Sequence, residues 1–224
     1  MSTPGLFERT FAAVLFDNDG TLVDSSDSVQ RSWVQWALEH DIDPHTLVGH
    51  HGMPAAAIIE SVGPHLDAAD ALARIEELEV GDVEGVVALP GVMDSLAALA
   101  STRDAPSVHT IATSATRALA QVRLEAAGID APPTLVAVDD VDRGKPNPDP
   151  FLLAAQRLGV DPRDCLVCED APSGVAAARA AGCAVLAVTT TSTAQELSGA
   201  DLIVDSLADV RFVREGDRVR VTRA

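Results

Sequence analysis

Short apolar runs alternate along this chain with segments of helical period, and this alternation limits the fold more than any other feature. The runs are 12–16 (AAVLF), 108–113 (VHTIAT), 134–138 (TLVAV), 165–169 (CLVCE), 184–188 (AVLAV) and 201–204 (DLIV). Helical patterns lie between them, such as 115–129 (ATRALAQVRLEAAGI), which reaches a glycine near its end. Strands that are apolar on both faces and alternate with helices form a parallel sheet covered by helices on both sides. We therefore expect an α/β fold.

One long segment interrupts the alternation. Residues 25–88 contain three stretches of helical period, SVQRSWVQWALEH, PAAAIIESV and DAADALARIEELEV, and no convincing strand. We therefore predict a Rossmann-like parallel-sheet core made of residues 1–24 and 89–224, with a smaller, all-helical cap inserted at 25–88. Near the other end, 212–222 (FVREGDRVRVT) alternates around Gly216-Asp217 and predicts a small hairpin.

Polar residues close several of the apolar runs. Asp17 and Asp19 follow the first run, Thr113 and Ser114 close the second, and Glu169 and Asp170 close the fourth. Ligands of parallel α/β sheets bind beyond the carboxyl ends of the strands, so these side chains are expected at one edge of the sheet. Negative charges at such short distances from one another are unfavourable unless a cation or a proton lies between them. The sequence therefore predicts a cation-binding site.

A single lysine stands out. Lysine and arginine together number 16, and Lys145, in the loop RGKPNPDPF, is the only lysine. Arginine and lysine differ in shape and hydration, so a lysine kept in an arginine-rich chain is a candidate for a position that needs a compact ammonium group. Lys145 follows the 134–138 run and is expected near the same edge of the sheet.

This set of residues suits phosphoryl transfer. The Asp17 carboxylate can attack phosphorus and form an aspartyl phosphate, while Asp19 protonates the leaving oxygen and later takes a proton from water. Lys145 and Mg²⁺ would offset the negative charge, with Asp17, Asp170 and the Asp19 carbonyl as metal ligands and Glu169 as a ligand or its neighbour. Gly20 allows a tight turn, and Thr113 with Ser114 offers hydroxyl and amide donors to the phosphate.

The composition limits the classes of molecule that this protein is expected to bind. The net charge of -18 disfavours nucleic acid and anionic membrane, which bind through clustered lysine and arginine. The first residues, MSTPGLFERTF, carry neither a basic segment nor a long apolar stretch, so we expect a cytoplasmic protein that acts on a small molecule. The proposed chemistry requires no oligomer. Cys165, Cys168 and Cys183 are expected to be apolar core residues rather than zinc ligands.

Four segments carry a resemblance to a known family. LFDNDGTLVDS, TIATSATR, RGKPNPDPF and CEDAPSGVAAARAAG resemble the four signature segments of the haloacid dehalogenase superfamily, in its branch of small phosphatases with a helical cap. The resemblance implies Asp17 as nucleophile, Asp19 as acid/base, Thr113 and Ser114 as phosphate binders, Lys145 as the motif lysine, and Glu169 and Asp170 as magnesium-side acids. Asn18 departs from the pattern, since an apolar residue is common there.

Within the family, three other enzyme classes compete with a phosphatase. Dehalogenases characteristically lack the second aspartate, so Asp19 favours phosphate chemistry. A phosphonatase needs a lysine in the cap, and Lys145 lies outside it. A β-phosphoglucomutase is the main alternative, but it carries a histidine after the first motif and a cap arginine, where this chain has Val29 and Pro54.

The remaining resemblance is to sugar and polyol phosphatases, including those acting on hexitol phosphates, 2-deoxyglucose 6-phosphate and glycerol phosphate. His50 and His51 of the cap are candidates for contacting the substrate's hydroxyl groups. A catalytically silent binding module is a further alternative, which the presence of all five charged motif residues disfavours.

Overall fold

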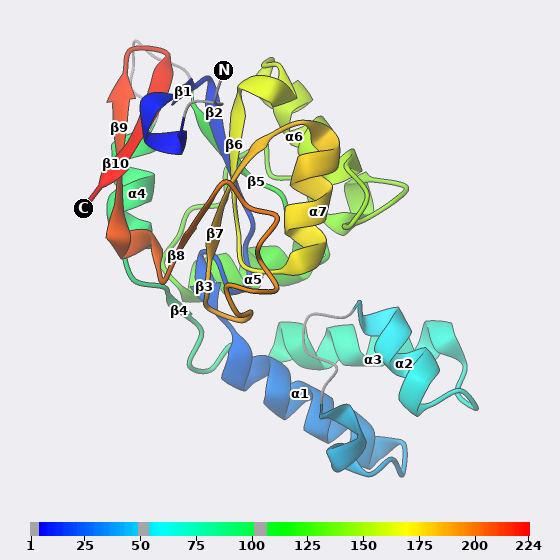
Figure 1. Cartoon of the computed structure of the whole chain (residues 1–224). Coiled ribbons are helices and arrows are strands. Elements are labelled where there is room, and N and C mark those ends of the chain that lie inside the picture. Colours follow the sequence, from blue (N-terminus) through cyan, green and yellow to red (C-terminus); the bar gives the residue numbers. More distant parts are fainter. Residues whose placement is uncertain (1–4, 49–53, 101–106) are drawn as a thin grey trace.

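A five-stranded parallel sheet forms the centre of the protein in the computed structural model, which describes residues 5–48, 54–100 and 107–224 (Figure 1). The strand order is β5-β2-β6-β7-β8. The strands are β2 (Ala13–Phe16), β5 (His109–Ile111), β6 (Cys165–Glu169), β7 (Ala184–Val188) and β8 (Leu202–Val204). All four pairings are parallel, so the predicted α/β fold with a parallel sheet is confirmed.

The sheet is apolar on both faces because helices cover both. In β2, Val14 and Phe16 belong to one buried cluster, whereas Ala13 and Leu15 belong to the other, as the two-residue period of a strand requires. The first cluster includes side chains of α4 (Val92–Leu99) and α5 (Arg117–Ala126). The second includes side chains of α6 (Asp149–Leu158) and α7 (Pro172–Ala181). The continuous apolar strands of the sequence therefore follow from burial on both sides.

Cys165, Cys168 and Cys183 all lie in these buried clusters as free thiols, so the prediction that they are core residues is confirmed. Burial raises the pKa of Cys165 and of Cys183 to about 12, which keeps both thiols protonated near neutral pH.

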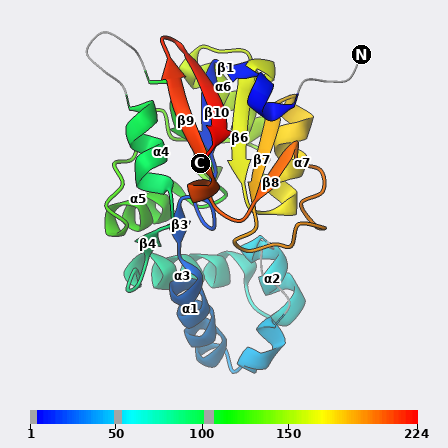
Figure 2. The ribbon, with the colours of Figure 1, turned by 60° about the vertical axis from the view of Figure 1, so that its left-hand side comes forward.

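Three helices form a separate layer below the sheet in the views of Figures 1 and 2. They are α1 (Ser26–Glu39), α2 (Ala55–Val62) and α3 (Ala68–Gly81). This cap has an apolar cluster of its own around Trp33 and Trp36, and the Trp36 indole Nε1 donates a hydrogen bond to the Ala71 carbonyl at 2.9 Å. Burying two tryptophans gives a small helical unit much of the apolar area that its stability needs.

The two chain segments that join the cap to the core pair with each other. β3 (Val23–Asp24) runs antiparallel to β4 (Val87–Ala88), with Val23 opposite Ala88. β4 lies inside the range 25–88, for which the sequence predicted helices alone. The difference arises because the segments that enter and leave the cap run side by side in opposite directions, which allows their backbones to hydrogen-bond.

A small antiparallel sheet, with strand order β1-β10-β9, packs against the first face. It consists of β1 (Thr10–Phe11), β9 (Val210–Glu215) and β10 (Arg218–Arg223), and Glu215 pairs with Arg218 across the Gly216-Asp217 turn. The predicted hairpin is therefore confirmed. Phe212 of β9 meets Phe16 of β2 edge to face, with ring centroids 5.8 Å apart.

The 134–138 run is not a strand of the sheet, and this prediction was wrong. Its backbone forms a single bridge, Ala112 to Val136, and then enters a 3₁₀ turn at Val138–Asp140. Pro132 and Pro133 precede the run and lack the amide hydrogens that a longer ladder would use. The Asp140 carboxylate accepts a hydrogen bond from the Ala137 amide, which favours the turn.

The helices of the described ranges are short. α1 and α3 each have 14 residues, and within the described part of the chain there is no helix long and apolar enough to cross a membrane.

Candidate active site

The register of the central strands brings the first and fourth signature segments together. Phe16 of β2 lies opposite Cys168 of β6, and the Asp17 amide donates to the Cys168 carbonyl at 2.9 Å. Asp17 and Glu169 are therefore the next residues of two adjacent strands, at the carboxyl end of the sheet. This is the position that the sequence predicted for both.

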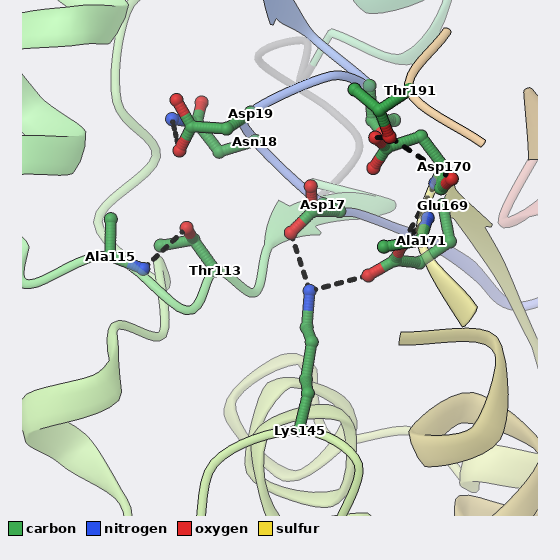
Figure 3. Close-up of polar contacts among 11 residues, drawn as sticks. Asp17, Asn18, Asp19, Thr113, Ala115, Lys145, Glu169, Asp170, Ala171 and Thr191 are labelled. Atoms are coloured by element: carbon green, nitrogen blue, oxygen red, sulfur yellow. Dashed lines mark hydrogen bonds and ion pairs between the residues drawn. The ribbon is translucent and has the colours of Figure 1, made fainter. Parts of the chain in front are cut away.

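Lys145 joins these two carboxylates. Its ammonium Nζ lies 2.5 Å from Oδ1 of Asp17 and 2.8 Å from Oε1 of Glu169, and its side chain is only 3% exposed (Figure 3). Burial by itself lowers the pKa of Lys145, but the two carboxylates outweigh it and hold this pKa above its ordinary value. The Phe151 ring of α6 lies under the ammonium at 5.0 Å. Lys145 is therefore a fixed positive charge beside Asp17.

Asp17, Glu169 and Asp170 form a buried acidic cluster. Each offers a carboxylate oxygen, and these oxygens all lie within 4.8 Å of one another. Burial, together with the negative charges of Glu169 and Asp170, raises the pKa of Asp17 well above its ordinary value despite Lys145. Burial and the charge of Glu169 likewise raise the pKa of Asp170 to about 7. One lysine thus leaves negative charge uncompensated, and three close carboxylates are the hard oxygen donors that suit Mg²⁺.

Glu169 is oriented by hydrogen bonds at both of its oxygens. Oε2 accepts from the amides of Asp170 and Ala171, each at 2.8 Å, while Oε1 accepts from Lys145. The start of α7 lies against this carboxylate, because a Cβ on Gly174 would be 1.6 Å from Oε1 of Glu169. A glycine is therefore required at 174 for Glu169 to occupy this position.

Hydroxyl groups hold Asp170. Thr21 donates to Oδ1 at 3.3 Å, and the Thr191 hydroxyl, from the loop after β7, donates to Oδ2 (Figure 3). Gly20 has a φ of 81°, and a Cβ there would lie 2.1 Å from Oδ2 of Asp170. Gly20 therefore allows the first motif to approach Asp170 closely, in addition to the turn that the sequence suggested.

Asp19 lies apart from this cluster. In Figure 3 it is on the other side of Asp17 from Glu169 and Asp170, and it is not part of the acidic group found among the described residues. Its Oδ1 accepts from Ser25 Oγ at 2.7 Å and from Arg123 Nη1 at 2.9 Å, and its Oδ2 accepts from Asn18 Nδ2 at 3.2 Å. The Asp19 side chain is thus engaged with groups outside the Asp17 site.

The second segment lies beside the first. The Ala112 amide donates to the Phe16 carbonyl at 2.8 Å, which places Thr113 next to the first motif. Thr113 is buried and its hydroxyl accepts from the Ala115 amide at 3.0 Å, whereas Ser114 is exposed. The two cap histidines, His50 and His51, lie outside the described residues.

Several contributors were not predicted from the sequence, and Thr191, Gly174 and Arg123 are the most informative of them. Thr191 follows the end of β7, so the rule that ligands lie beyond strand ends could have identified it. Gly174 lies in the quoted segment EDAPSG. Arg123 is the least expected, because it occupies the middle of a helix; the signal is that it falls three residues after buried Ala120, on the apolar side of α5.

Comparisons with known proteins agree with these segments. The family model of the haloacid dehalogenase-like hydrolases matches residues 11–182. Hexitol phosphatase A of Escherichia coli (strain K12) is 38% identical over 205 residues, which are 90% of this chain and 94% of that protein. Fructose-1-phosphate phosphatase YqaB of the same organism is 35% identical over 194 residues, which are 79% and 95% of the two chains.

A solved structure agrees as well. A hydrolase from Pseudomonas syringae aligns with a TM-score of 0.74 at 26% identity and covers 88% of this chain and 94% of that one. The resemblance inferred from the four segments is confirmed. The chain is therefore an enzyme of the haloacid dehalogenase-like hydrolase family.

Proposed function

We propose that this enzyme hydrolyses small phosphate monoesters, with Asp17 as nucleophile and a sugar or polyol phosphate as substrate. The observation that carries the proposal is the contact of Lys145 with both Asp17 and Glu169 beside a third buried carboxylate. A carboxylate and a phosphate repel each other, so the attack needs positive charge beside both groups. The site has one cation, Lys145, and carboxylate oxygens that could bind a second, a metal ion.

The chemistry needs two displacements at phosphorus. In the first, an Asp17 oxygen forms a bond to phosphorus while the bond to the substrate oxygen breaks, and protonated Asp19 gives its proton to that leaving oxygen. In the second, Asp19 takes a proton from water, the water oxygen bonds to phosphorus, and the bond to Asp17 breaks. The products are an alcohol and inorganic phosphate, and Asp17 and Asp19 return to their starting states.

Lys145 assists both displacements. Its ammonium lies 2.5 Å from one Asp17 oxygen, so it fixes that carboxylate and supplies positive charge where the phosphate oxygens would approach. Thr113, buried at the end of the neighbouring strand, is positioned to add a hydroxyl donor, and exposed Ser114 beside it is accessible to substrate. Gly20 allows the first motif to approach Asp170 closely.

We assign the proposed metal to the cluster of Asp17, Asp170 and Glu169, with the Asp19 carbonyl as a further candidate ligand. Because both oxygens of Glu169 accept hydrogen bonds, Asp17 and Asp170 are the stronger candidates for direct contact. A bound Mg²⁺ would neutralise phosphate oxygens during attack. Burial first, and the neighbouring carboxylates second, raise the pKa values of Asp17 and Asp170; a cation bound between them would offset both effects, which supports this assignment.

The substrate class rests on the relatives, whose names include hexitol phosphatase and fructose-1-phosphate phosphatase. We further propose that residues 25–88 act as the substrate-selecting cap, with His50 and His51 as hydroxyl contacts. A mutase would need a second phosphate site on the cap. Val29 instead packs against the cap's own apolar cluster, and Pro54 precedes α2.

The test is phosphate release from a panel of hexitol, fructose, glycerol and 2-deoxyglucose phosphates, with Mg²⁺ and after exhaustive treatment with EDTA. We expect release that depends on Mg²⁺ and is lost in Asp17→Asn. Full activity after EDTA would contradict the metal assignment. Conversion of β-glucose 1-phosphate to glucose 6-phosphate, faster than phosphate release, would instead favour the mutase.

A further inference from the structure

Arg123 is a buried arginine whose guanidinium lies between the core and the cap. It belongs to α5, and its side chain is 5% exposed. Nη1 donates to Oδ1 of Asp19 at 2.9 Å, and Nη2 lies 3.4 Å from Oε1 of Glu79 on cap helix α3. Its Nε and Nη2 atoms are buried and make no hydrogen bond within the described ranges. Burying guanidinium nitrogens without hydrogen-bond partners costs free energy, so the position of Arg123 calls for an explanation.

The contact to Asp19 is part of a three-sided cage. Ser25 Oγ and Asn18 Nδ2 donate to the same carboxylate, and Ser25 immediately precedes α1, where the chain enters the cap. Of the three donors, only Arg123 carries a charge, and a charge-assisted hydrogen bond is the strongest kind. Arg123 is therefore the donor that most constrains the direction in which the Asp19 carboxylate points.

The contact to Glu79 ties the same guanidinium to the cap. The Glu79 side chain is 13% exposed, and burial raises its pKa, with Arg123 acting in the opposite direction. Three residues earlier on α3, Glu76 accepts a hydrogen bond from the Thr116 hydroxyl, the N-cap of α5, at 2.7 Å. Residues three apart on a helix share a face, so this face of α3 is the one that meets α5.

We propose that Arg123 is a positioning residue that links Asp19 to the cap through Glu79, so that alignment of the acid/base depends on the α3–α5 contact. This inference rests on the proposed function, in which Asp19 serves both displacements. Removing the guanidinium leaves Asp19 with two neutral donors and takes from Glu79 its ion-pair partner. The contact with Asp19 is the shorter of the two, so Arg123 is coupled more strongly to Asp19 than to Glu79.

The leaving group separates positioning from a purely structural role. A sugar alkoxide leaves poorly without a proton, whereas p-nitrophenolate leaves readily, so a misaligned Asp19 slows sugar phosphates more. By analogy with groups that orient metal ligands, whose loss costs about 10- to 100-fold in activity, we expect Arg123→Gln to lower kcat on the best sugar phosphate by a similar factor, with a smaller loss on p-nitrophenyl phosphate. KM should change little on either. Arg123→Lys, which keeps the charge, should recover part of the loss.

The double variant with Asp19→Asn gives the sharpest measurement. If Arg123 acts through Asp19, Arg123→Gln has little further effect on kcat in the Asp19→Asn background. Equal losses on both substrates, or losses that add to those of Asp19→Asn, would overturn the proposal. Arg179→Gln is the matched control, because Arg179 pairs with Asp201 on the surface of α7 and should leave both activities unchanged.

A second pair of variants covers the case in which Arg123→Gln does not fold. Glu79→Gln should lower kcat on sugar phosphates in the same direction but less, and Glu77→Gln is its control, being exposed on the same helix and paired with Arg74. If Glu79→Gln matches Glu77→Gln, the link to the cap is refuted. Loss of the proposed function gives a different result, since wild-type enzyme would then release phosphate from neither substrate.

Discussion

Asp17 and Asp19 are two residues apart, but their surroundings are of different kinds. The partners of Asp17 come from the parallel sheet and the loops at its carboxyl edge: Lys145, Glu169 and the backbone of β6. Apart from its neighbour Asn18, the partners of Asp19 are Arg123 of α5 and Ser25 at the entrance to the cap. Strand register fixes Asp17 relative to Glu169, whereas the Arg123 contact to Asp19 depends on α5, which packs against cap helix α3. The arrangement at the sheet edge therefore does not depend on the cap, whereas the surroundings of Asp19 depend on the position of the cap relative to α5.

The largest expected effect falls on the sheet-edge side of this comparison. Asp17→Asn should abolish turnover of every substrate, because an amide does not attack phosphorus. The fold should survive, since the change is nearly isosteric and removes one charge from a crowded acidic cluster. Phosphate release and circular dichroism measure the two outcomes. Substantial activity in pure, folded Asp17→Asn protein would show that the nucleophile lies elsewhere.

Asp19→Asn should separate the two regions most directly. We expect a loss of about 10²- to 10⁴-fold in kcat on sugar phosphates, the usual contribution of general acid–base catalysis, and a smaller loss on p-nitrophenyl phosphate. The difference arises because p-nitrophenolate needs no proton to leave. Steady-state kinetics on the two substrates measures it, and equal losses would exclude Asp19 as the acid.

Lys145→Arg tests whether the sheet edge needs a compact cation. Charge is kept, but a planar guanidinium does not fit where Nζ now lies between Asp17 and Glu169 in a nearly closed space. We expect a loss of roughly 10²- to 10³-fold in kcat, comparable to removing one preorganised donor, on sugar and aryl phosphates alike. Wild-type rates in the variant would mean that the single lysine of the chain reflects composition alone.

The contrast between the regions also explains what the sequence could predict. Strand ends in a parallel sheet meet at one edge, so Asp17, Glu169 and Asp170 could be brought together from the apolar runs alone. The prediction of a strand at 134–138 was wrong because two prolines before the run and the turn stabilised by Asp140 outweigh its apolar composition. The Arg123–Asp19 contact could not be predicted, because it spans 104 residues and depends on the rotation of a helix about its axis.

Asp170→Asn is expected to stabilise the metal-free protein and to remove the stabilisation that Mg²⁺ gives. The pKa of Asp170, raised to about 7 chiefly by burial, means that its ionised form is unfavourable in the metal-free fold. Removing that charge at pH 8 should raise the metal-free Tm, by about 2–4 °C for each kcal/mol gained in the free energy of unfolding. Mg²⁺ should raise the Tm of wild-type protein but not of the variant.

Thermal unfolding with and without MgCl₂ gives this readout independently of activity. Asp149→Asn is a matched control, because Asp149 pairs with exposed Arg143 outside the cluster. An equal Mg²⁺ response in wild-type and Asp170→Asn protein would remove Asp170 from the metal site. It would also weaken the view that the sheet edge is built around a cation.

The smallest effect is expected in the cap itself, at His50 and His51. A neutral imidazole can donate to or accept from a hydroxyl group, and each such hydrogen bond contributes about 0.5–1.5 kcal/mol. Replacing both with alanine should therefore raise KM for sugar phosphates roughly 2- to 10-fold for each hydrogen bond removed, with kcat unchanged. p-Nitrophenyl phosphate has no hydroxyl groups to bind, so its KM should stay constant. Equal changes for both substrates would remove the histidines from the substrate site, whereas a change in kcat confined to sugar phosphates would mean that this part of the cap also influences Asp19.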